Sequence, residues 1–217
     1  MKILLISDTH RRHEELELEE ADMIIHCGDY SSAEMSFFYF LKWFNELDYK
    51  YKIFISGNHD QKAAKLGADK IKKLSSLFGD AIYLEDESIE IEGFKIYGSP
   101  WTPSFGPWEF MKGETGLKPI WEKIPSDTQI LITHGPQHGV LDKVKDFGKY
   151  KHVGSRTLSN KMAELKEIKY HFFGHIHGET GVIEADEFKN YVSINASSLY
   201  EYYQNTENVK PPILINI

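Results

Sequence analysis

The sequence predicts an α/β protein, a four-layer α/β/β/α sandwich in which two stacked, mixed β-sheets are flanked by helices. Two observations support this fold. The first sixty residues alternate strand-sized apolar runs with helical segments, as parallel sheets do. The whole chain also contains more strand-like runs than one sheet holds comfortably, so two packed sheets are expected. A chain of 217 residues can bury a large core, and we expect a single domain spanning residues 1–217.

The first half of the chain supplies strands and the clearest helices. Apolar runs at residues 2–7, 23–27 and 52–56 are expected to be buried parallel strands. Residues 32–47 carry aromatic side chains at helical spacing behind a Ser-Ser cap, which predicts a helix. Residues 61–78 are expected to form one or two helices, with a break near Gly67.

In the second half, the spacing of apolar residues changes to the alternation typical of strands. Residues 88–91 and 94–97 alternate like a hairpin closed by Glu92 and Gly93. Residues 98–116 predict a long loop with a short helix at 108–112, and residues 135–152 a second irregular stretch. A helix is expected at 155–167. The remaining strands are expected at residues 129–133, 170–173, 181–184, 191–194 and 213–217.

Composition excludes several classes of partner. The net charge is −8 and basic runs are absent, which argues against binding of extended nucleic acid. No apolar run approaches the length of a membrane span, and Asp8 and His10 interrupt the first run too early for a secretory signal. Cys27 is the only cysteine, so no intramolecular disulfide can form. We therefore expect a cytoplasmic protein without a membrane partner; the sequence leaves its oligomeric state open.

Five of the apolar runs end in residues that bind metals or phosphates. Ligands in open α/β sheets bind beyond the carboxyl ends of the strands, so these side chains should meet at one edge. Imidazole and carboxylate together suit divalent ions such as Mn, Fe, Zn, Co or Ni. The pattern therefore predicts a metal site. The candidate ligands are Asp8, His10, Asp29, Asn58, His134, His175 and His177.

Asp29 is the natural shared ligand of two ions. It follows Gly28, whose missing side chain lets the backbone come close to a metal, and its two carboxylate oxygens can bind one ion each. Two cations about 3.5–4 Å apart clamp a phosphate and lower the pKa of a bridging water to near neutrality. We expect two divalent ions, with Mn ahead of Fe, Zn, Co, Ni and Mg, and a small phosphoester as the substrate.

The motifs Asp-x-His, Gly-Asp, Gly-Asn-His-Asp, a Gly-flanked His and Gly-His-x-His occur in this order from residue 8 to residue 177. This series resembles the calcineurin-like metallophosphoesterase superfamily, with similarity from residue 3 to about 197. The resemblance implies a sandwich of two β-sheets with helices outside. It also implies two ligand sets. One set is Asp8, His10, Asp29 and His177, and the other is Asp29, Asn58, His134 and His175.

His59 is expected to act in the reaction without binding a metal. It lies beside the ligand Asn58, and Asp60 could orient its ring. A histidine near its ordinary pKa can donate a proton to a departing alkoxide. The predicted mechanism is in-line attack on phosphorus by a hydroxide that bridges the two ions, with His59 and Asp60 as catalytic residues.

A closer resemblance is to the metallophosphoesterase-domain-containing proteins, which are class III cyclic-nucleotide phosphodiesterase-like. It is carried by Tyr-Gly-Ser-Pro-Trp at residues 97–101, Trp-Glu-Phe at 108–110 and Ile-Asn-Ala-Ser at 194–197, together with the histidine motifs. It implies hydrolysis of a phosphodiester, with cyclic nucleotides as candidate substrates. Trp101, Phe105 and Trp108 are interpreted either as an aromatic wall for a nucleobase or as packing of the loop on the sheet.

Three other functions stay open. A phosphomonoesterase or phosphoprotein phosphatase is weakened because Gly28-Asp29 is not followed by Asp-Arg-Gly. A nuclease is weakened by the acidic balance, although short oligonucleotides remain compatible with it. A non-catalytic scaffold would be expected to lack ligands, and none is lost here. His13, His26, His152 and His171 are interpreted as packing residues, and Asn195 and Ser197 as support for the ligand loops.

Overall fold

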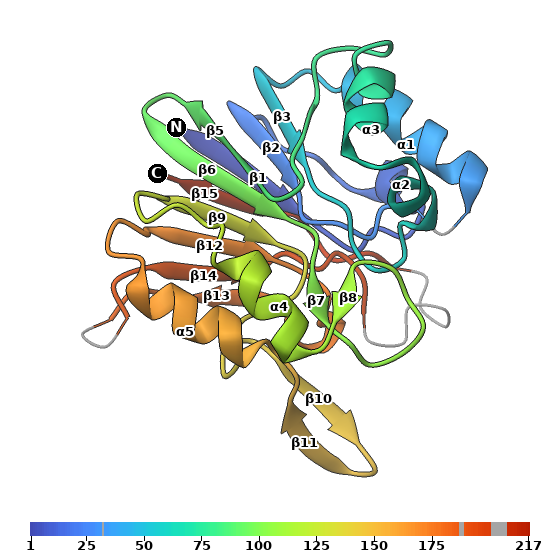
Figure 1. Ribbon diagram of the computed structural model, residues 1–217. Helices are drawn as coiled ribbons and strands as arrows, with labels where there is room; N and C mark the ends of the chain where they lie inside the picture. The colour runs from blue at the N-terminus through green and yellow to red at the C-terminus, as the bar shows by residue number, and fades with distance from the viewer. Residues whose placement is uncertain (32, 187–188, 201–207) are drawn as a thin grey trace.

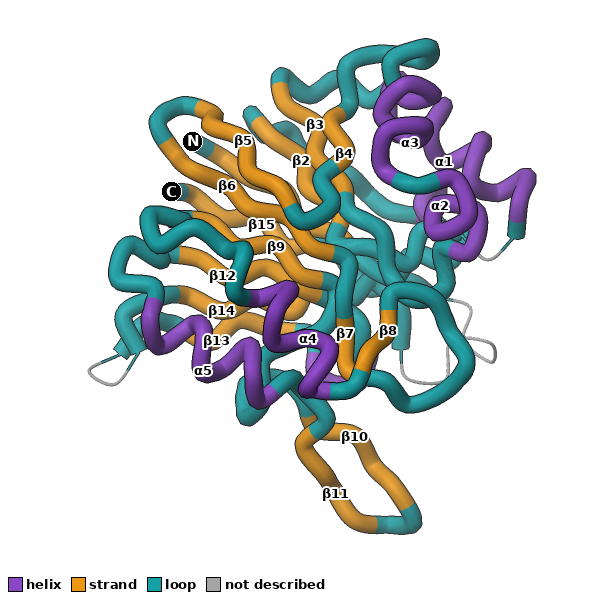
Figure 2. Tube along the Cα trace, viewed as in Figure 1, coloured by secondary structure: helices purple, strands orange, loops and turns teal. Residues whose placement is uncertain are grey.

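The computed structural model describes residues 1–31, 33–186, 189–200 and 208–217, and it has the four layers predicted from the sequence (Figures 1 and 2). Two large sheets face each other in the centre. One group of helices covers the outer face of the first sheet, and a second group covers the outer face of the second sheet. Among the described residues, no helix is both long enough and apolar enough to cross a bilayer.

The first sheet is mostly parallel. In spatial order, its strands are β15 (Ile213–Asn216), β1 (Lys2–Ile6), β2 (Met23–His26), β3 (Tyr51–Phe54) and β4 (Ile82–Tyr83). Only β15 is antiparallel to its neighbour. Ile6 pairs with His26, and His26 with Phe54, so three strands end at one level. The residues that follow them therefore leave the sheet at the same edge.

The second sheet repeats this arrangement. In spatial order, its strands are β13 (Gly181–Ile183), β14 (Val192–Asn195), β12 (Tyr170–Phe173), β9 (Ile130–Thr133), β6 (Phe94–Ser99) and β5 (Glu87–Ile91). The four central strands are parallel, and both outer strands are antiparallel to their neighbours. A parallel bridge between Ser7 and Ser197 joins the end of β1 to the segment after β14. The carboxyl edges of the two sheets therefore meet.

The hydrophobic core lies in three seams between the four layers. The central seam packs Ile3, Leu5 and Ile25 of the first sheet with Ile132 and Phe172 of the second. These side chains are fully buried, and each contributes roughly 1.5–3 kcal/mol relative to an exposed side chain. This apolar seam fixes the two sheet edges against each other.

The outer seams hold the helices. Helices α1 (Glu34–Glu46), α2 (Gln61–Leu66) and α3 (Ala68–Ser75) cover the first sheet, and α4 (Glu114–Trp121) and α5 (Arg156–Glu164) cover the second. Phe37, Phe40, Leu41 and Phe44 recur at helical spacing in α1 and all face the sheet, because an apolar stripe of this width buries one side of a helix. The predicted helix 32–47 is confirmed for residues 34–46; Ser32 lies outside the described residues.

Most predicted elements are confirmed, including the break between α2 and α3 and the β5–β6 hairpin. The predicted helix at residues 108–112 is wrong, because residues 111 and 112 form a short strand. This segment instead contains the paired strands β7 (Thr102–Pro103) and β8 (Met111–Lys112), and the helix begins later, at Glu114. Gly116 and Pro119 have low helix propensity and conceal α4 in the sequence. Burial of Leu117 and Trp121 against the second sheet overrides that propensity.

Residues 135–152 are less irregular than predicted. They contain a hairpin, β10 (Lys143–Asp146) and β11 (Lys149–His152), which projects from the body of the molecule (Figure 1). Its strands are rich in lysine, which is depleted in strands, so the amino-acid pattern provides little signal for them. Two short 3₁₀ helices, η1 (His13–Glu15) and η2 (His177–Glu179), complete the described elements.

Candidate metal centre

All predicted ligands lie where the carboxyl edges of the two sheets meet. Several of them have a left-handed backbone, with φ of 53° at Asp8, 42° at His10, 59° at Asp29 and 70° at His175. This conformation costs a non-glycine residue about 1–3 kcal/mol and is found where the surrounding structure imposes it. The backbone after β1, β2 and β12 is therefore bent, so that these side chains turn into the shared edge.

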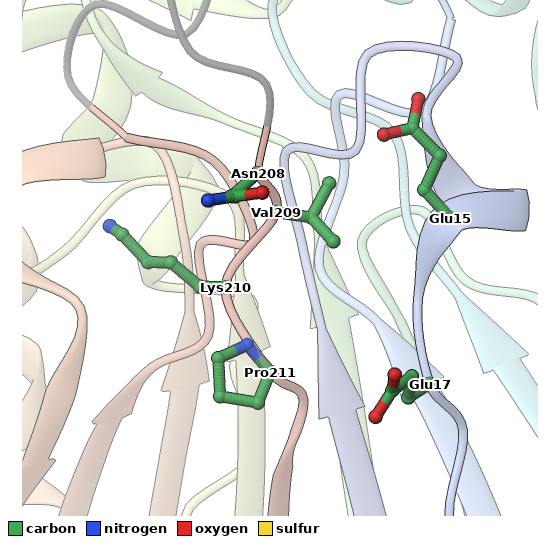
Figure 3. Close-up of a pocket in the computed structure, with 6 residues that line it drawn as sticks. All are labelled: Glu15, Glu17, Asn208, Val209, Lys210 and Pro211. Carbon is green, nitrogen blue, oxygen red and sulfur yellow. The ribbon is translucent and has the colours of Figure 1, made fainter.

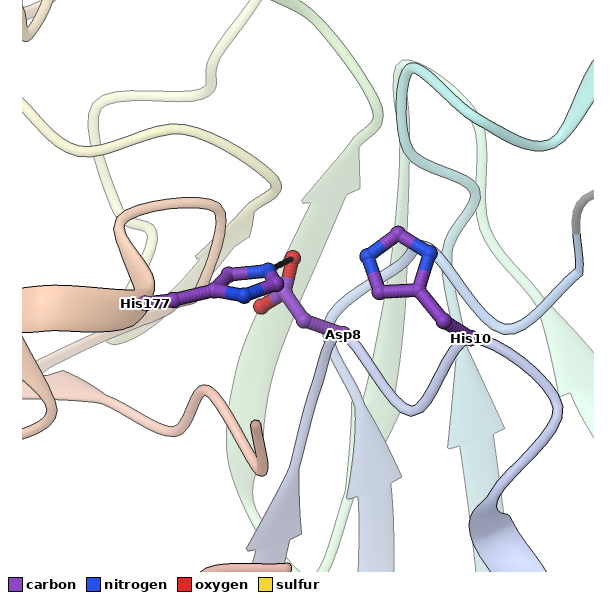
Figure 4. Close-up of side chains that lie close together, drawn as sticks. All are labelled: Asp8, His10 and His177. Atoms are coloured by element: carbon purple, nitrogen blue, oxygen red, sulfur yellow. Dashed lines mark ion pairs between the residues drawn. The ribbon is translucent and has the colours of Figure 1, made fainter. Parts of the chain in front are cut away.

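The first ligand group joins residues that are far apart in the sequence. Asp8 and His10 follow β1, and His177 follows β12; one ligand atom from each lies within 4.8 Å of the other two (Figure 4). His177 Nε2 is 3.5 Å from Asp8 Oδ1, and the ring centroids of His10 and His177 are 5.4 Å apart. Two imidazoles and one carboxylate at this spacing match a divalent transition metal.

The second ligand group contains Asp29, His134 and His175, again with one ligand atom from each within 4.8 Å of the others. His134 Nε2 is 3.4 Å from Asp29 Oδ2 and 2.9 Å from Asn58 Oδ1. Asp29 Oδ2 is also 3.8 Å from His10 Nε2 of the first group. Asp29 thus lies between the two groups, as a shared ligand must.

The protonation of four of these groups fits metal binding. Burial lowers the pKa of His10 to about 4 and of His175 to about 3, so both are neutral at pH 7, the form that binds metals. Burial also raises the pKa of Asp8 and Asp29. The imidazoles of His177 and His134 outweigh that effect and hold both below the usual range. Two buried carboxylates are therefore ionised.

The chain itself compensates this negative charge only in part. The buried Oδ1 atom of Asp8 accepts no hydrogen bond from any residue that the structure describes. His134 and His177 supply part of the compensation, since the charge of Asp29 outweighs burial and raises the pKa of His134 to about 9, and Asp8 likewise raises the pKa of His177. Buried charge that is not fully paired costs several kcal/mol. Divalent cations would remove this cost, so the residues present fit a pair of metal ions.

Two glycines of the motifs are required for space. A Cβ atom on Gly57 would lie 2.3 Å from Asp29 Oδ1 and 2.6 Å from His134 Cε1. A Cβ atom on Gly174 would lie 2.2 Å from Asp8 Oδ2. Real Cβ atoms do not approach other heavy atoms so closely, so any side chain here would displace a ligand.

Comparison with known proteins is consistent with this geometry. A sequence profile of the calcineurin-like phosphoesterases matches residues 1–179. The chain belongs to this family. The human and mouse metallophosphoesterase domain-containing protein 1 are each 34% identical to it over 239 residues, covering 100% of the chain and 71% of the relative. The crystal structure of TT1561 from Thermus thermophilus has the same fold, with a TM-score of 0.64 at 15% identity, covering 89% of this chain and 88% of that one.

His59 of this phosphoesterase lies beside both ligand groups. Its backbone N–H donates to Asp29 Oδ1 at 2.7 Å. The centroid of its ring is 4.9 Å from that of His10 and 4.2 Å from that of Trp108. His59 therefore faces the same edge, and Trp108 packs against its ring.

Asp60 has a different place from the one expected. Its carboxylate accepts hydrogen bonds from the backbone N–H groups of Asp29 at 2.9 Å, Gly57 at 2.8 Å and Ser31 at 2.8 Å. In the described part of the chain, no hydrogen bond or ion pair joins it to the ring of His59. Burial and the charge of Asp29 raise the pKa of Asp60 to about 8, and the backbone donors oppose this. Asp60 thus ties together the loops that follow β2 and β3.

The ligand loops have further support from side chains outside the predicted ligand set. Ser197 Oγ donates to Asp8 Oδ2 at 2.6 Å, and Asn195 Nδ2 donates to the Ile176 carbonyl at 2.8 Å, the supporting role expected from the sequence. His26 does more than pack. Its Nε2 is 3.0 Å from Thr9 Oγ1, and its Nδ1 accepts from the Gly28 N–H at 3.2 Å, so it joins the loops after β1 and β2.

A hollow of about 220 Å³ opens over the ligands. Four side chains other than the predicted ligands and His59 surround it. Phe105 comes from the long loop, Lys143 and Val144 from β10, and Ile176 from the loop after β12. The ring centroid of Phe105 is 5.3 Å from that of His175. The sequence did not point to Lys143 or Val144, because they lie in the hairpin that it failed to predict.

A second hollow, of about 370 Å³, has no predicted ligand in its wall. It lies between the segment after η1 and residues 208–211, and Glu15, Glu17 and Lys210 are its charged residues (Figure 3). The ammonium group of Lys210 donates to Thr180 Oγ1 at 2.6 Å and to the His177 carbonyl. Lys210 therefore supports the His177 loop from the side of this hollow.

Proposed function

We propose that this phosphoesterase is a phosphodiesterase that uses two divalent metal ions and acts on a small diester. The observation that supports this proposal is the position of Asp29 between two ligand groups. Asp8, His10, Asp29 and His177 would hold one ion. Asp29, Asn58, His134 and His175 would hold the other, with Mn as the first metal to test.

When bound, such a pair of ions polarises the phosphoryl oxygens and makes a water molecule more acidic. Protonation of the leaving group is the task of a side chain of the protein. Addition of water to phosphorus breaks the bond to the leaving oxygen, which needs a proton as it departs. His59 is the proposed donor, because its ring faces the ligand edge beside His10. The products are a phosphomonoester and an alcohol.

The walls of the hollow favour a diester over a monoester. A monoester carries more negative charge, and sites for it are often rich in arginine. Of the lining residues described, Lys143 is the only lysine and none is arginine. Tyr30, which follows Asp29, is fully buried against Phe40 with ring centroids 3.9 Å apart. The segment after Gly28-Asp29 therefore offers no cation where protein phosphatases have their Asp-Arg-Gly motif.

Cyclic nucleotides are the diesters to test first. Phe105 is 64% exposed at the edge of the hollow, and Trp108 is 39% exposed beside His59. An aromatic face of this kind can stack with a planar base. Trp101 is unsuitable for this, since it packs against Phe110 and donates to Asp86 Oδ2 at 3.2 Å.

The deciding experiment compares bis(nitrophenyl) phosphate with nitrophenyl phosphate, using protein titrated with Mn. We expect faster turnover of the diester. Preference for the monoester would assign the protein to the phosphomonoesterases instead. Tight binding of metal without turnover of either compound, or of 2′,3′- and 3′,5′-cyclic nucleotides, would support a scaffold function and overturn the proposal.

A further inference from the structure

The β10–β11 hairpin has a surface unlike the rest of the chain. Its ten residues contain four lysines and one aspartate, whereas the chain as a whole has a net charge of −8. Lys151 pairs with Asp146 at 2.6 Å. Lys143, Lys145 and Lys149 have no carboxylate of the described chain within ion-pair distance. This local positive charge is available to an anion.

The strand register places basic and aromatic side chains together. Lys143 pairs with His152, and Lys145 pairs with Tyr150, so these side chains lie on one face of the hairpin. All four are exposed. Alternate residues of a strand are about 7 Å apart, which is comparable with the separation of neighbouring phosphates along an extended single strand.

The tip of the hairpin carries an aromatic ring that folding does not bury. Phe147 has φ of 44° and Gly148 has φ of 80°, a turn in which asparagine, aspartate or glycine is preferred at the first position. A bulky residue with positive φ is strained. The side chain of Phe147 is fully exposed and that of Tyr150 is 70% exposed. The fold thus retains a strained, solvent-exposed phenylalanine, which points to a use outside the fold.

The base of the hairpin belongs to the candidate active site. Lys143 and Val144 line the hollow over the ligands. Asp142 fixes this base, because its Oδ2 accepts from the N–H groups of Gly139 at 3.0 Å and Gly154 at 2.9 Å, and its Oδ1 contacts His152. A molecule bound along the hairpin would therefore reach the metal centre.

We propose that the hairpin binds a short single-stranded oligonucleotide and presents one of its phosphodiesters to the metal centre. Lys143 and Lys145, which lie two residues apart on this face, contact neighbouring phosphates, and Phe147 and Tyr150 stack with bases. The presentation step rests on the phosphodiesterase function proposed above. Strands of four residues are about 13 Å long, which limits the contact to two or three nucleotides. This limit agrees with an acidic protein that does not hold extended nucleic acid.

An anionic membrane is the main alternative partner, since a basic hairpin with one aromatic tip could also rest on lipid headgroups. The structure favours the oligonucleotide. The second aromatic residue, Tyr150, lies on the side of the hairpin beside Lys145 and not at its tip. The basic face also continues into the hollow through Lys143.

The test uses fluorescein-labelled hexathymidylate and the full chain. Binding is measured by fluorescence anisotropy in EDTA at low salt, so that hydrolysis does not consume the probe. We expect Phe147→Asn, which also relieves the strained turn, to weaken binding at least about fivefold. We expect Lys145→Gln, which removes a cation of this face outside the hollow, to weaken it about threefold. The matched controls are Leu77→Asn, which replaces a residue that is 74% exposed, and Lys70→Gln on α3.

The outcomes separate this inference from the proposed function. Weaker oligonucleotide binding in the hairpin variants, with unchanged turnover of bis(nitrophenyl) phosphate, supports the hairpin as a binding element. Equal binding by wild type, controls and hairpin variants overturns it, whether or not small diesters are hydrolysed. If the hairpin variants lose binding to phosphatidylserine vesicles but still bind the oligonucleotide as wild type does, the proposal is overturned in favour of a membrane partner. Normal hairpin-dependent binding without hydrolysis of any diester leaves the hairpin assignment standing and refutes the phosphodiesterase.

Discussion

The metal-ligand edge and the β10–β11 hairpin lie next to each other but are stabilised in opposite ways. Asp8, Asp29, Asn58 and His134 are buried almost completely, and each is fixed by hydrogen bonds or ion pairs to groups distant in the sequence. The hairpin is exposed and is fixed mainly by its own strand pairing and by Asp142. The proposed chemistry and the proposed oligonucleotide binding thus depend on separate parts of the structure, which can be altered independently.

The largest effect is expected at the residue that the two ligand groups share. Replacing Asp29 by Asn removes a charge that faces His10 and His134. We expect kcat for bis(nitrophenyl) phosphate to fall by at least about a thousandfold, since electrostatic stabilisation at such a site is usually the largest contribution. Metal content, measured by elemental analysis, should fall as well. The control Asp69→Asn, at an exposed position of α3, should change neither.

The next effect separates proton transfer from metal binding. His59→Ala removes the proposed proton donor but none of the predicted ligands. We expect turnover of a cyclic nucleotide, whose leaving group is a poor one, to fall by roughly a hundredfold. Turnover of bis(nitrophenyl) phosphate should fall much less, because nitrophenolate leaves without a proton. Equal losses on both substrates would show that His59 positions a metal or the substrate instead.

A smaller effect is expected where the support of the ligands is altered. Asp60 accepts hydrogen bonds from the backbone N–H groups of Asp29, Gly57 and Ser31. Replacement by Asn reverses part of this pattern of donors and acceptors, and we expect metal affinity to fall by roughly 10–100-fold, as for other outer-sphere partners of metal ligands. Competition with a fluorescent chelator measures this. Unaltered affinity would mean that the loops after β2 and β3 do not need this carboxylate.

The smallest effect, and one that depends on pH, is expected at the base of the hairpin. Burial raises the pKa of Asp142, but hydrogen bonds from His152, Gly139 and Gly154 outweigh this and hold it below its ordinary value. A carboxyl group with a lowered pKa stabilises the fold above its unfolded pKa and loses this contribution as the pH falls through its folded pKa.

Replacing Asp142 by Asn should therefore lower the free energy of unfolding by about 1–3 kcal/mol at pH 7. The difference from wild type should shrink below a pH of about 4, near the ordinary pKa of aspartate. Urea denaturation at several pH values measures both quantities. A difference that is independent of pH would show that the charge of Asp142 is not what anchors the hairpin.

The sequence predicted well which side chains meet at the sheet edge, because local rules determine it. A buried parallel strand is a short apolar run, and the residue after it must leave at the carboxyl edge, so the apolar pattern alone is enough to place Asp8, Asp29 and His134. The hairpin was not predicted because lysine has a low propensity for strands. Helix α4 was not predicted because Gly116 and Pro119 have a low propensity for helices. The partners of Asp60 and His26 could not be predicted, since they depend on how separate loops meet.

The hydrogen bonds that Asp8 accepts also have a consequence for folding. Its partners His175 and Ser197 are 167 and 189 residues away along the chain. Contacts of such long range form late, because the loop between them must be closed before either partner is in place. Metal ions should then bind only after the two sheets have docked. Added metal should then slow unfolding and leave the refolding rate almost unchanged. The ions would stabilise the folded structure without initiating folding.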